Sequence, residues 1–85
     1  MNAMKKQQDE FVLNAVLSES SVIKRAEYSS KKGSRSGELS LIMNSGEKYD
    51  YSDVPETVFL ELVHSASAGS YFNTDIKPKY SFVHV

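Results

Sequence analysis

The residues best suited to chemistry in this 85-residue sequence are two histidines and a serine-rich segment. His64 and His84 lie far apart and the sequence has no cysteine, so a zinc site would need carboxylates from elsewhere in the chain. Ser67, Ser70 and Asn73 surround a glycine, but no neighbouring histidine and acid complete a nucleophile and its base. No phosphate-binding glycine motif is present. We therefore expect no enzyme, no metal site and no cofactor.

Positive charge is concentrated in residues 21–37, which contain five lysines and arginines and one acidic residue. Such cations bind the phosphates of RNA, through contacts that weaken as salt is added. A solvated loop between two strands accounts for the same composition. The candidate nucleic-acid contacts are Lys24, Arg25, Lys31, Lys32 and Arg35, with Lys77 and Lys79 near the carboxyl end.

Negative charge is concentrated in residues 38–61, which contain six acidic residues and one lysine. An acidic surface is poorly suited to phosphate, so it favours a protein partner. The candidate protein contacts are Glu47, Asp50, Asp53, Glu56 and Glu61.

The segment "EKYDYS" places two tyrosines on one side of a predicted strand. Residues two apart in a strand share a face, so Tyr49 and Tyr51 point away from the charged set that includes Asp50. We expect them on the face shared with Leu39 and Leu41. Core packing is the preferred interpretation, and an exposed surface for base stacking is the alternative.

Three predicted strands form an antiparallel meander. "SVIKRAEYSS" reads as the first, with Ile23, Ala26 and Tyr28 pointing inward and a bulge near Lys24 and Arg25. "ELSLIMN" and "EKYDYS" are the second and third, joined by a turn at "NSGE" that uses Gly46. The connection "SSKKGSRSG" reads as exposed and longer than a tight hairpin needs.

Residues 55–67 form the clearest predicted helix, because their apolar side chains recur at spacings of three and four. Pro55 suits the first turn, and Asp53 is expected to serve as N-cap or to interact with the positive end of the helix. Gly69 is expected to end the helix or its continuation. We expect this helix to cover the tyrosine face. The last residues are expected to form a short strand or a docked tail. The predicted core contains Ile23, Tyr28, Leu39, Leu41, Tyr49, Tyr51, Val58, Phe59, Leu62 and Phe72.

Residues 1–17 are predicted to be an amino-terminal extension to a main domain of residues 18–85. Its composition favours a helix, whereas the alternation of Phe11, Leu13, Ala15 and Leu17 allows a strand. The segment is neither a signal peptide nor a membrane span, so we expect a cytoplasmic protein without membrane contact. The predicted fold class is α+β: a three-stranded antiparallel meander packed on one main helix.

Several of these elements together resemble the KTSC domain, over about residues 17–80. They are the "YDY" of Tyr49 to Tyr51, the "VP" of Val54 and Pro55, and "SAGSYFNTDIKPKY" from Ser67 onward. That small domain is named for a carboxyl-terminal extension of some lysyl-tRNA synthetases, and it also occurs as a stand-alone protein in bacteria and phages. The resemblance implies RNA binding, tRNA for example, because of that fusion partner.

Three functions therefore remain open, each with a different binding partner. In the first, the protein is a non-catalytic module that binds RNA. The second is a small phage or mobile-element protein that engages a host protein through its acidic face or its amino-terminal segment. The third is a homodimer, formed at a sheet edge or by exchange of the tail, instead of a monomer.

Overall fold

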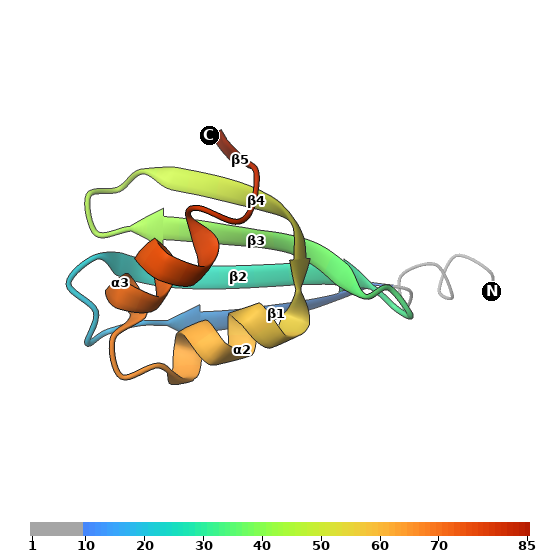
Figure 1. Cartoon of the computed structure of the whole chain (residues 1–85), viewed down its shortest axis with the longest axis horizontal. Coiled ribbons are helices and arrows are strands. Elements are labelled where there is room, and N and C mark those ends of the chain that lie inside the picture. The colour runs from blue at the N-terminus through green and yellow to red at the C-terminus, as the bar shows by residue number, and fades with distance from the viewer. Residues whose placement is uncertain (1–9) are drawn as a thin grey trace.

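The computed structural model describes residues 10–85, which form a five-stranded antiparallel sheet with helices on one face (Figure 1). The strands lie in sequence order across the sheet: β1 (Glu10–Val16), β2 (Ile23–Lys31), β3 (Ser36–Met43), β4 (Lys48–Pro55) and β5 (Phe82–His84). Between β4 and β5 come helix α2 (Glu56–His64), the short helix α3 (Ala68–Tyr71) and the π-helical turn η1 (Phe72–Ile76). The predicted α+β class is confirmed, and strands β1 and β5 extend the predicted meander.

Strand β1 shows that the preferred helix for the amino-terminal segment is wrong from Glu10 onward, and that the strand allowed by its alternating apolar residues is correct. The whole strand pairs with β2, from Glu10 opposite Lys31 to Val16 opposite Arg25. Alternation then places Leu13 on the helix-covered face, packed against the core. The free edge of β2 offered a full ladder of hydrogen bonds, which outweighed the weak helix propensity of the segment. The rest of the predicted helix, residues 1–9, lies outside the described residues.

Strand β2 contains the predicted bulge. Its register with β3 shifts between Ile23 and Arg25. An extra residue at this point brings Ile23, Ala26 and Tyr28 onto one face although their spacing is irregular. All three side chains are buried, as predicted.

The β2–β3 connection is shorter than predicted, because the ladder continues through its serines. β2 ends at Lys31 and β3 begins at Ser36. The buried Ser30 hydroxyl donates to the Ser36 carbonyl oxygen (3.2 Å), which ties the two strands together near the turn. Gly37 is required here, since a Cβ at this position would overlap the carbonyl oxygen of Ser29.

Strand β4 orients its two tyrosines as predicted, on the face of Leu39 and Leu41. Tyr51 lies opposite Leu39, and Tyr49 lies opposite Leu41. Tyr51 is buried and Tyr49 partly buried. A second element adds to the cover over them, because the ring of Tyr51 packs on Phe72 of η1, with centroids 6.0 Å apart.

Positive φ angles occur near both ends of β4. Gly46 has φ 98° in the turn that precedes the strand, as predicted. Asp53 has φ 57°, a conformation that aspartate tolerates better than most residues. Asp53 is not the N-cap of α2, and that prediction is wrong. Pro55 occupies the capping position in an extended conformation, because the chain turns into the helix only after it.

Helix α2 covers the β2 side of the sheet. Its buried residues Val58, Phe59 and Leu62 form the predicted apolar stripe. The Phe59 ring lies 5.9 Å from that of Tyr28, centroid to centroid. The Tyr28 hydroxyl donates to the carbonyl oxygen of Val54 (2.7 Å), so one buried side chain links β2 to the segment that leads into α2.

The predicted end of this helix is wrong. α2 stops at His64, because Ser65 is extended and accepts a hydrogen bond from the Ser67 N–H on its hydroxyl (3.1 Å). Such local bonds compete with helix propagation. Gly69 lies inside α3 instead of ending α2. A Cβ there would stand 3.0 Å from a methyl group of Val22, so glycine lets α3 approach the β1–β2 connection closely.

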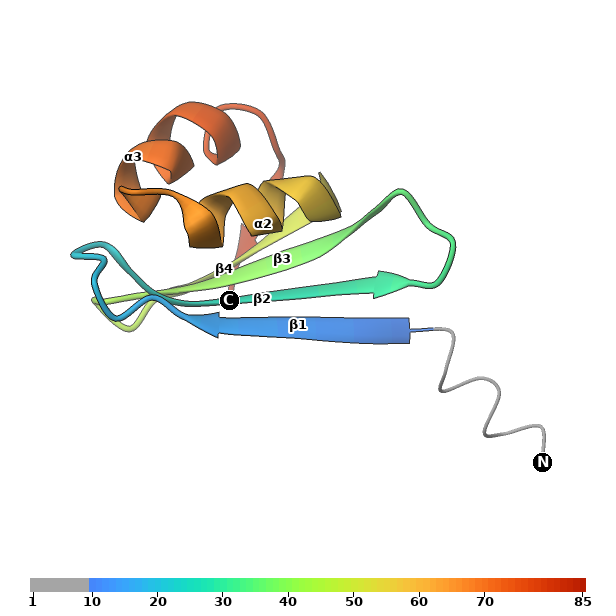
Figure 2. The same cartoon turned by 90° about the horizontal axis from the view of Figure 1, so that it is seen from below.

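The turn η1 anchors the carboxyl-terminal segment. Phe72 and Ile76 are buried, as expected of anchors, and the Lys77 N–H donates to the Phe72 carbonyl oxygen (2.9 Å). In Figure 2 all helical elements lie on the same side of the sheet. The predicted core is confirmed for Ile23, Tyr28, Leu39, Leu41, Tyr51, Val58, Phe59, Leu62 and Phe72, whereas Tyr49 lies at its margin.

Candidate functional site

The candidate cations are exposed but do not form one surface. Arg25 lies near the start of β2 and Lys31 at its end, about 20 Å away at the usual rise per residue. Arg25 is also engaged, since it lies 3.6 Å from the carboxylate of Glu27. Lys79 lies 3.5 Å from Asp75. Three of the candidate cations lie together at the β2–β3 hairpin, between the end of β2 and the start of β3: Lys31, Lys32 and Arg35.

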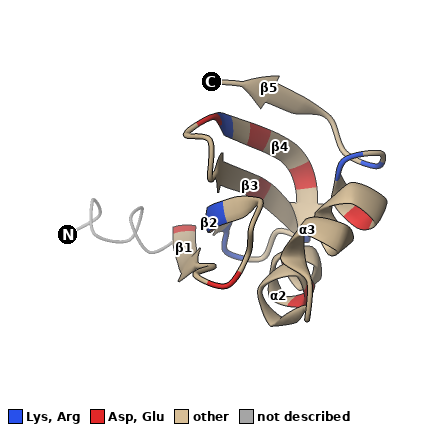
Figure 3. Cartoon of the chain, turned by 90° about the vertical axis from the view of Figure 1, so that its left-hand side faces the viewer, with Lys and Arg blue, Asp and Glu red and all other residues tan. Residues whose placement is uncertain are grey.

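The candidate acids are likewise spread over different parts of the molecule (Figure 3). Asp50 lies on the sheet face opposite the helices and accepts a hydrogen bond from Ser40 (2.7 Å). Glu61 lies on α2 and accepts from the Tyr71 hydroxyl (2.6 Å). Burial and then this bond raise the pKa of Tyr71. The remaining candidates occupy the β3–β4 turn, β4 and the first turn of α2: Glu47, Asp53 and Glu56.

An aromatic cluster covers the margin of the core beside β5. Tyr49 stacks on His84 at 4.7 Å and meets Phe82 edge to face at 5.5 Å. Its hydroxyl donates to Glu47 (3.1 Å), and this bond is the main cause that raises the pKa of Tyr49. Burial raises the pKa of Tyr51. The flat face of Tyr49 is therefore already occupied by an imidazole, and no open two-tyrosine stacking surface exists.

Two of the residues considered for catalysis or metal binding, His64 and Ser67, make hydrogen bonds to nearby backbone groups. His64 pairs its Nδ1 with the Leu60 carbonyl oxygen (2.9 Å). The Ser67 hydroxyl accepts from the Ser70 N–H (3.3 Å) and so caps α3. Within residues 10–85, no three His, Cys, Asp or Glu side chains are grouped so that they could hold a metal ion.

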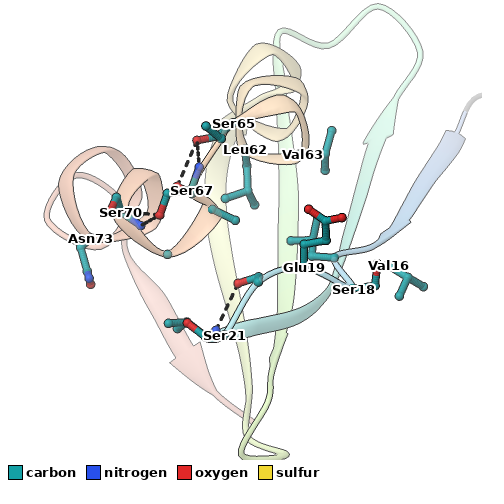
Figure 4. A pocket seen from close by; sticks show the side chains of 16 residues that line it. Val16, Ser18, Glu19, Ser21, Leu62, Val63, Ser65, Ser67, Ser70 and Asn73 are labelled. Atoms are coloured by element: carbon teal, nitrogen blue, oxygen red, sulfur yellow. Dashed lines mark hydrogen bonds between the residues drawn. The ribbon is translucent and has the colours of Figure 1, made fainter.

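A cleft of about 560 Å³ separates the β1–β2 connection from the α2–α3 connection (Figure 4). One wall carries Ser65, Ser67 and Ser70, and the other carries Ser18 and Glu19. Serine hydroxyls of the first wall bond to neighbouring backbone groups of their own turn. Sequence reasoning missed this cleft, because two turns distant in sequence create it.

The outer edge of β1 is a free hydrogen-bonding edge of the sheet within the described chain, since β1 is the first strand in the sheet order and pairs on one side only. The Leu17 N–H donates to the Lys24 carbonyl oxygen (2.9 Å), which continues the β1–β2 ladder by one pair. Residues of an antiparallel strand alternate between pointing their N–H and C=O groups toward one neighbour and toward the other side. The groups that point away from β2 therefore belong to Glu10, Val12, Asn14 and Val16.

No described element covers this edge. In Figure 2 β1 runs across the front of the sheet, with α2 and α3 in a layer above it. The strand "EFVLNAV" contains no lysine, no proline and no register shift, which are the usual protections of an edge. Three of its apolar side chains are also exposed, at 39% for Phe11, 58% for Val12 and 69% for Val16. The period-two pattern in the sequence allowed this strand, but gave no indication that it would lie at the edge of the sheet.

The segment that suggested the family resemblance forms α3 and η1. Ser67 caps α3, Gly69 allows the close approach to Val22, and Phe72 fills the core beside Tyr51. The family model of the KTSC domain matches residues 19–80. The chain belongs to the KTSC domain family. Its characteristic segment thus has a structural role here, in docking α3 and η1 onto the sheet.

Strand β1 lies outside the matched residues of the KTSC domain, yet it pairs with β2 along its whole length. No curated protein matches the chain. Among residues 10–85, none of the helices has the length and apolar character needed to cross a membrane.

Proposed function

We propose that this KTSC-domain protein is a non-catalytic, cytoplasmic module that binds a strand of a protein partner through the free edge of β1. The observation that carries the proposal is the edge of β1, which no element within residues 10–85 covers. Four of its residues point their backbone groups outward, and apolar side chains are exposed on both faces. Strand addition to such an edge is a common mode of recognition, in which the main chain supplies affinity and side chains supply specificity. The lack of cysteine suits a reducing compartment.

The charge distribution favours a protein partner over RNA. A phosphate backbone requires several cations on one continuous surface. Here the cations near the start and the end of β2 are separated by the length of the strand, and Arg25 and Lys79 already pair with acids. Of the two contacts considered for a protein partner, the described part of the amino-terminal segment, β1, offers one continuous strand edge, whereas the acidic residues lie on separate elements.

An affinity pulldown with and without nuclease tests the proposal. We expect one protein in stoichiometric amount, resistant to nuclease, and lost with Val12→Lys because an edge lysine opposes strand addition. Val83→Lys is the matched control, since Val83 is a 64% exposed valine on the other edge strand, β5. Equal recovery by both variants would show that β1 is not the contact.

RNA binding is the rival, and the hairpin cluster of Lys31, Lys32 and Arg35 is the observation that favours it. In that case nuclease removes the recovered material. Replacing the three cations with alanine would then weaken RNA binding and reduce its salt slope by roughly one unit for each lost phosphate contact. That outcome, with no effect of Val12→Lys, would replace the proposed function by RNA recognition.

A further inference from the structure

We infer that the strand received by the β1 edge is β1 of a second copy, paired antiparallel about a two-fold axis at Leu13. This inference rests on the proposed function and names its partner. The resulting dimer would join two five-stranded sheets into one continuous sheet.

The register follows from which backbone groups point outward. Pairing about Leu13 places Val12 of one copy opposite Asn14 of the other, and Glu10 opposite Val16. All four are residues whose N–H and C=O groups point away from β2, so each gains a hydrogen-bonding partner. A register shifted by one residue would place backbone groups that point outward in one copy opposite groups that point toward β2 in the other. A register shifted by two residues would leave Glu10 or Val16 without a partner within the described strand.

The side chains are compatible with this arrangement. On the helix-covered face Leu13 meets its own copy, and Phe11 lies opposite Ala15. Glu10 is the only charged residue in the strand, and it lies opposite Val16. No like charges therefore meet, as they would in a self-pairing strand with a charge near its centre.

Helix α2 supplies a second argument. Glu61 faces α3, because it accepts a hydrogen bond from Tyr71. At helical periodicity Val63 lies on the opposite flank of α2, with Leu60 beside it. Leu60 is 40% exposed, and Val63 lines the cleft together with Val16 of β1. This flank therefore faces the β1 side and would approach its counterpart across the two-fold axis.

Cysteine scanning tests the register, because the native chain has no cysteine. Leu13 would meet its copy as a non-hydrogen-bonded pair, with Cα atoms about 4.5 Å apart and within disulfide reach. Leu13→Cys should therefore form a covalent dimer on mild oxidation. Ala15→Cys is the matched control on the same face, since the two copies of residue 15 would lie about 13 Å apart. A mixture of Phe11→Cys and Ala15→Cys chains should cross-link, and it tests the register even if Leu13→Cys folds poorly.

Analytical ultracentrifugation of the full chain completes the test. We expect a dimer whose dissociation constant rises at least about tenfold with Val12→Lys, because its two symmetry-related copies disrupt pairing twice. A chain that stays monomeric, while a pulldown recovers a different protein that Val12→Lys abolishes, would overturn the inference and leave the proposed function standing. A dimer that forms equally with Val12→Lys, or in which Ala15→Cys cross-links as readily as Leu13→Cys, would overturn the inference as well.

Discussion

Removing the hydroxyl of Tyr28 should measurably destabilise the fold. Tyr28 is 1% exposed, and its hydroxyl donates to the Val54 carbonyl oxygen at 2.7 Å. Tyr28→Phe keeps the ring and its contact with Phe59 but leaves that buried carbonyl without its partner. Such an unsatisfied group costs about 1–3 kcal/mol. A domain of this length has a free energy of unfolding of roughly 4–13 kcal/mol, so the loss is a substantial fraction of the total.

Urea denaturation followed by circular dichroism measures this loss. The free energy of unfolding of a small domain falls by about 1 kcal/mol per molar urea, so the unfolding midpoint of Tyr28→Phe should lie about 1 M or more below that of the native chain. Tyr49→Phe is the control, because the Tyr49 hydroxyl bonds to an exposed carboxylate of Glu47. Its change should stay within about 0.5 kcal/mol. Equal effects of the two substitutions would refute the argument that burial of the acceptor sets the cost.

The same variant has a signature at high pH. Burial raises the pKa of Tyr28 above its ordinary value near 10. The unfolded chain therefore ionises this phenol at lower pH than the folded one, so the stabilisation is complete below pH 10 and is lost as pH rises through the folded pKa. The urea midpoint of Tyr28→Phe should decline less steeply above about pH 10 than that of the native chain. Parallel declines would contradict this assignment.

Three further predictions concern the turns and helix α3. Gly37→Ala should destabilise the protein by about 1–3 kcal/mol in urea denaturation, because a fixed backbone oxygen occupies the space of the new Cβ; an unchanged midpoint would contradict the hairpin geometry. Ser67→Ala should cost about 1 kcal/mol by removing the cap of α3, whereas Ser67→Thr should retain most of it; equal losses would exclude the capping role. Glu61→Gln should lower the pKa of Tyr71 in an ultraviolet titration but leave it above 10, because burial is the larger cause of its elevation; an unchanged pKa would show that the bond to Glu61 has no part in it.

The sequence predicted the elements whose patterns are local and consistent. The alternation in β3 and β4 placed Leu39, Leu41, Tyr49 and Tyr51 on one face, because strand geometry alone decides that arrangement. The irregular spacing of β2 located the bulge beside Arg25. The family could also be recognised, because its characteristic segments keep their order in the chain.

The errors arose where other hydrogen-bonding partners outweighed the helical pattern of the sequence. The segment from Glu10 to Val16 has residues that suit a helix, but the open edge of β2 made a strand more favourable. The serines after His64 ended α2 earlier than its apolar pattern suggested, because hydroxyl bonds to nearby backbone groups replaced helical ones. The edge of β2 lies outside any short window of the amino-terminal sequence, and the apolar pattern of α2 carries no information about the serine bonds that follow it.

The sequence by itself determined the α+β class, the orientation of the tyrosine strand and the residues of the core, since these depend on periodicity and on burial of apolar side chains. Only the tertiary structure decided which surfaces are continuous. Arg25 and Lys31 lie near opposite ends of β2, and the antiparallel pairing of β2 with its neighbours keeps that strand extended, so the two cations stand about 20 Å apart although they are close in sequence. The same folding left β1 at the rim, where its outward backbone groups meet no other described element.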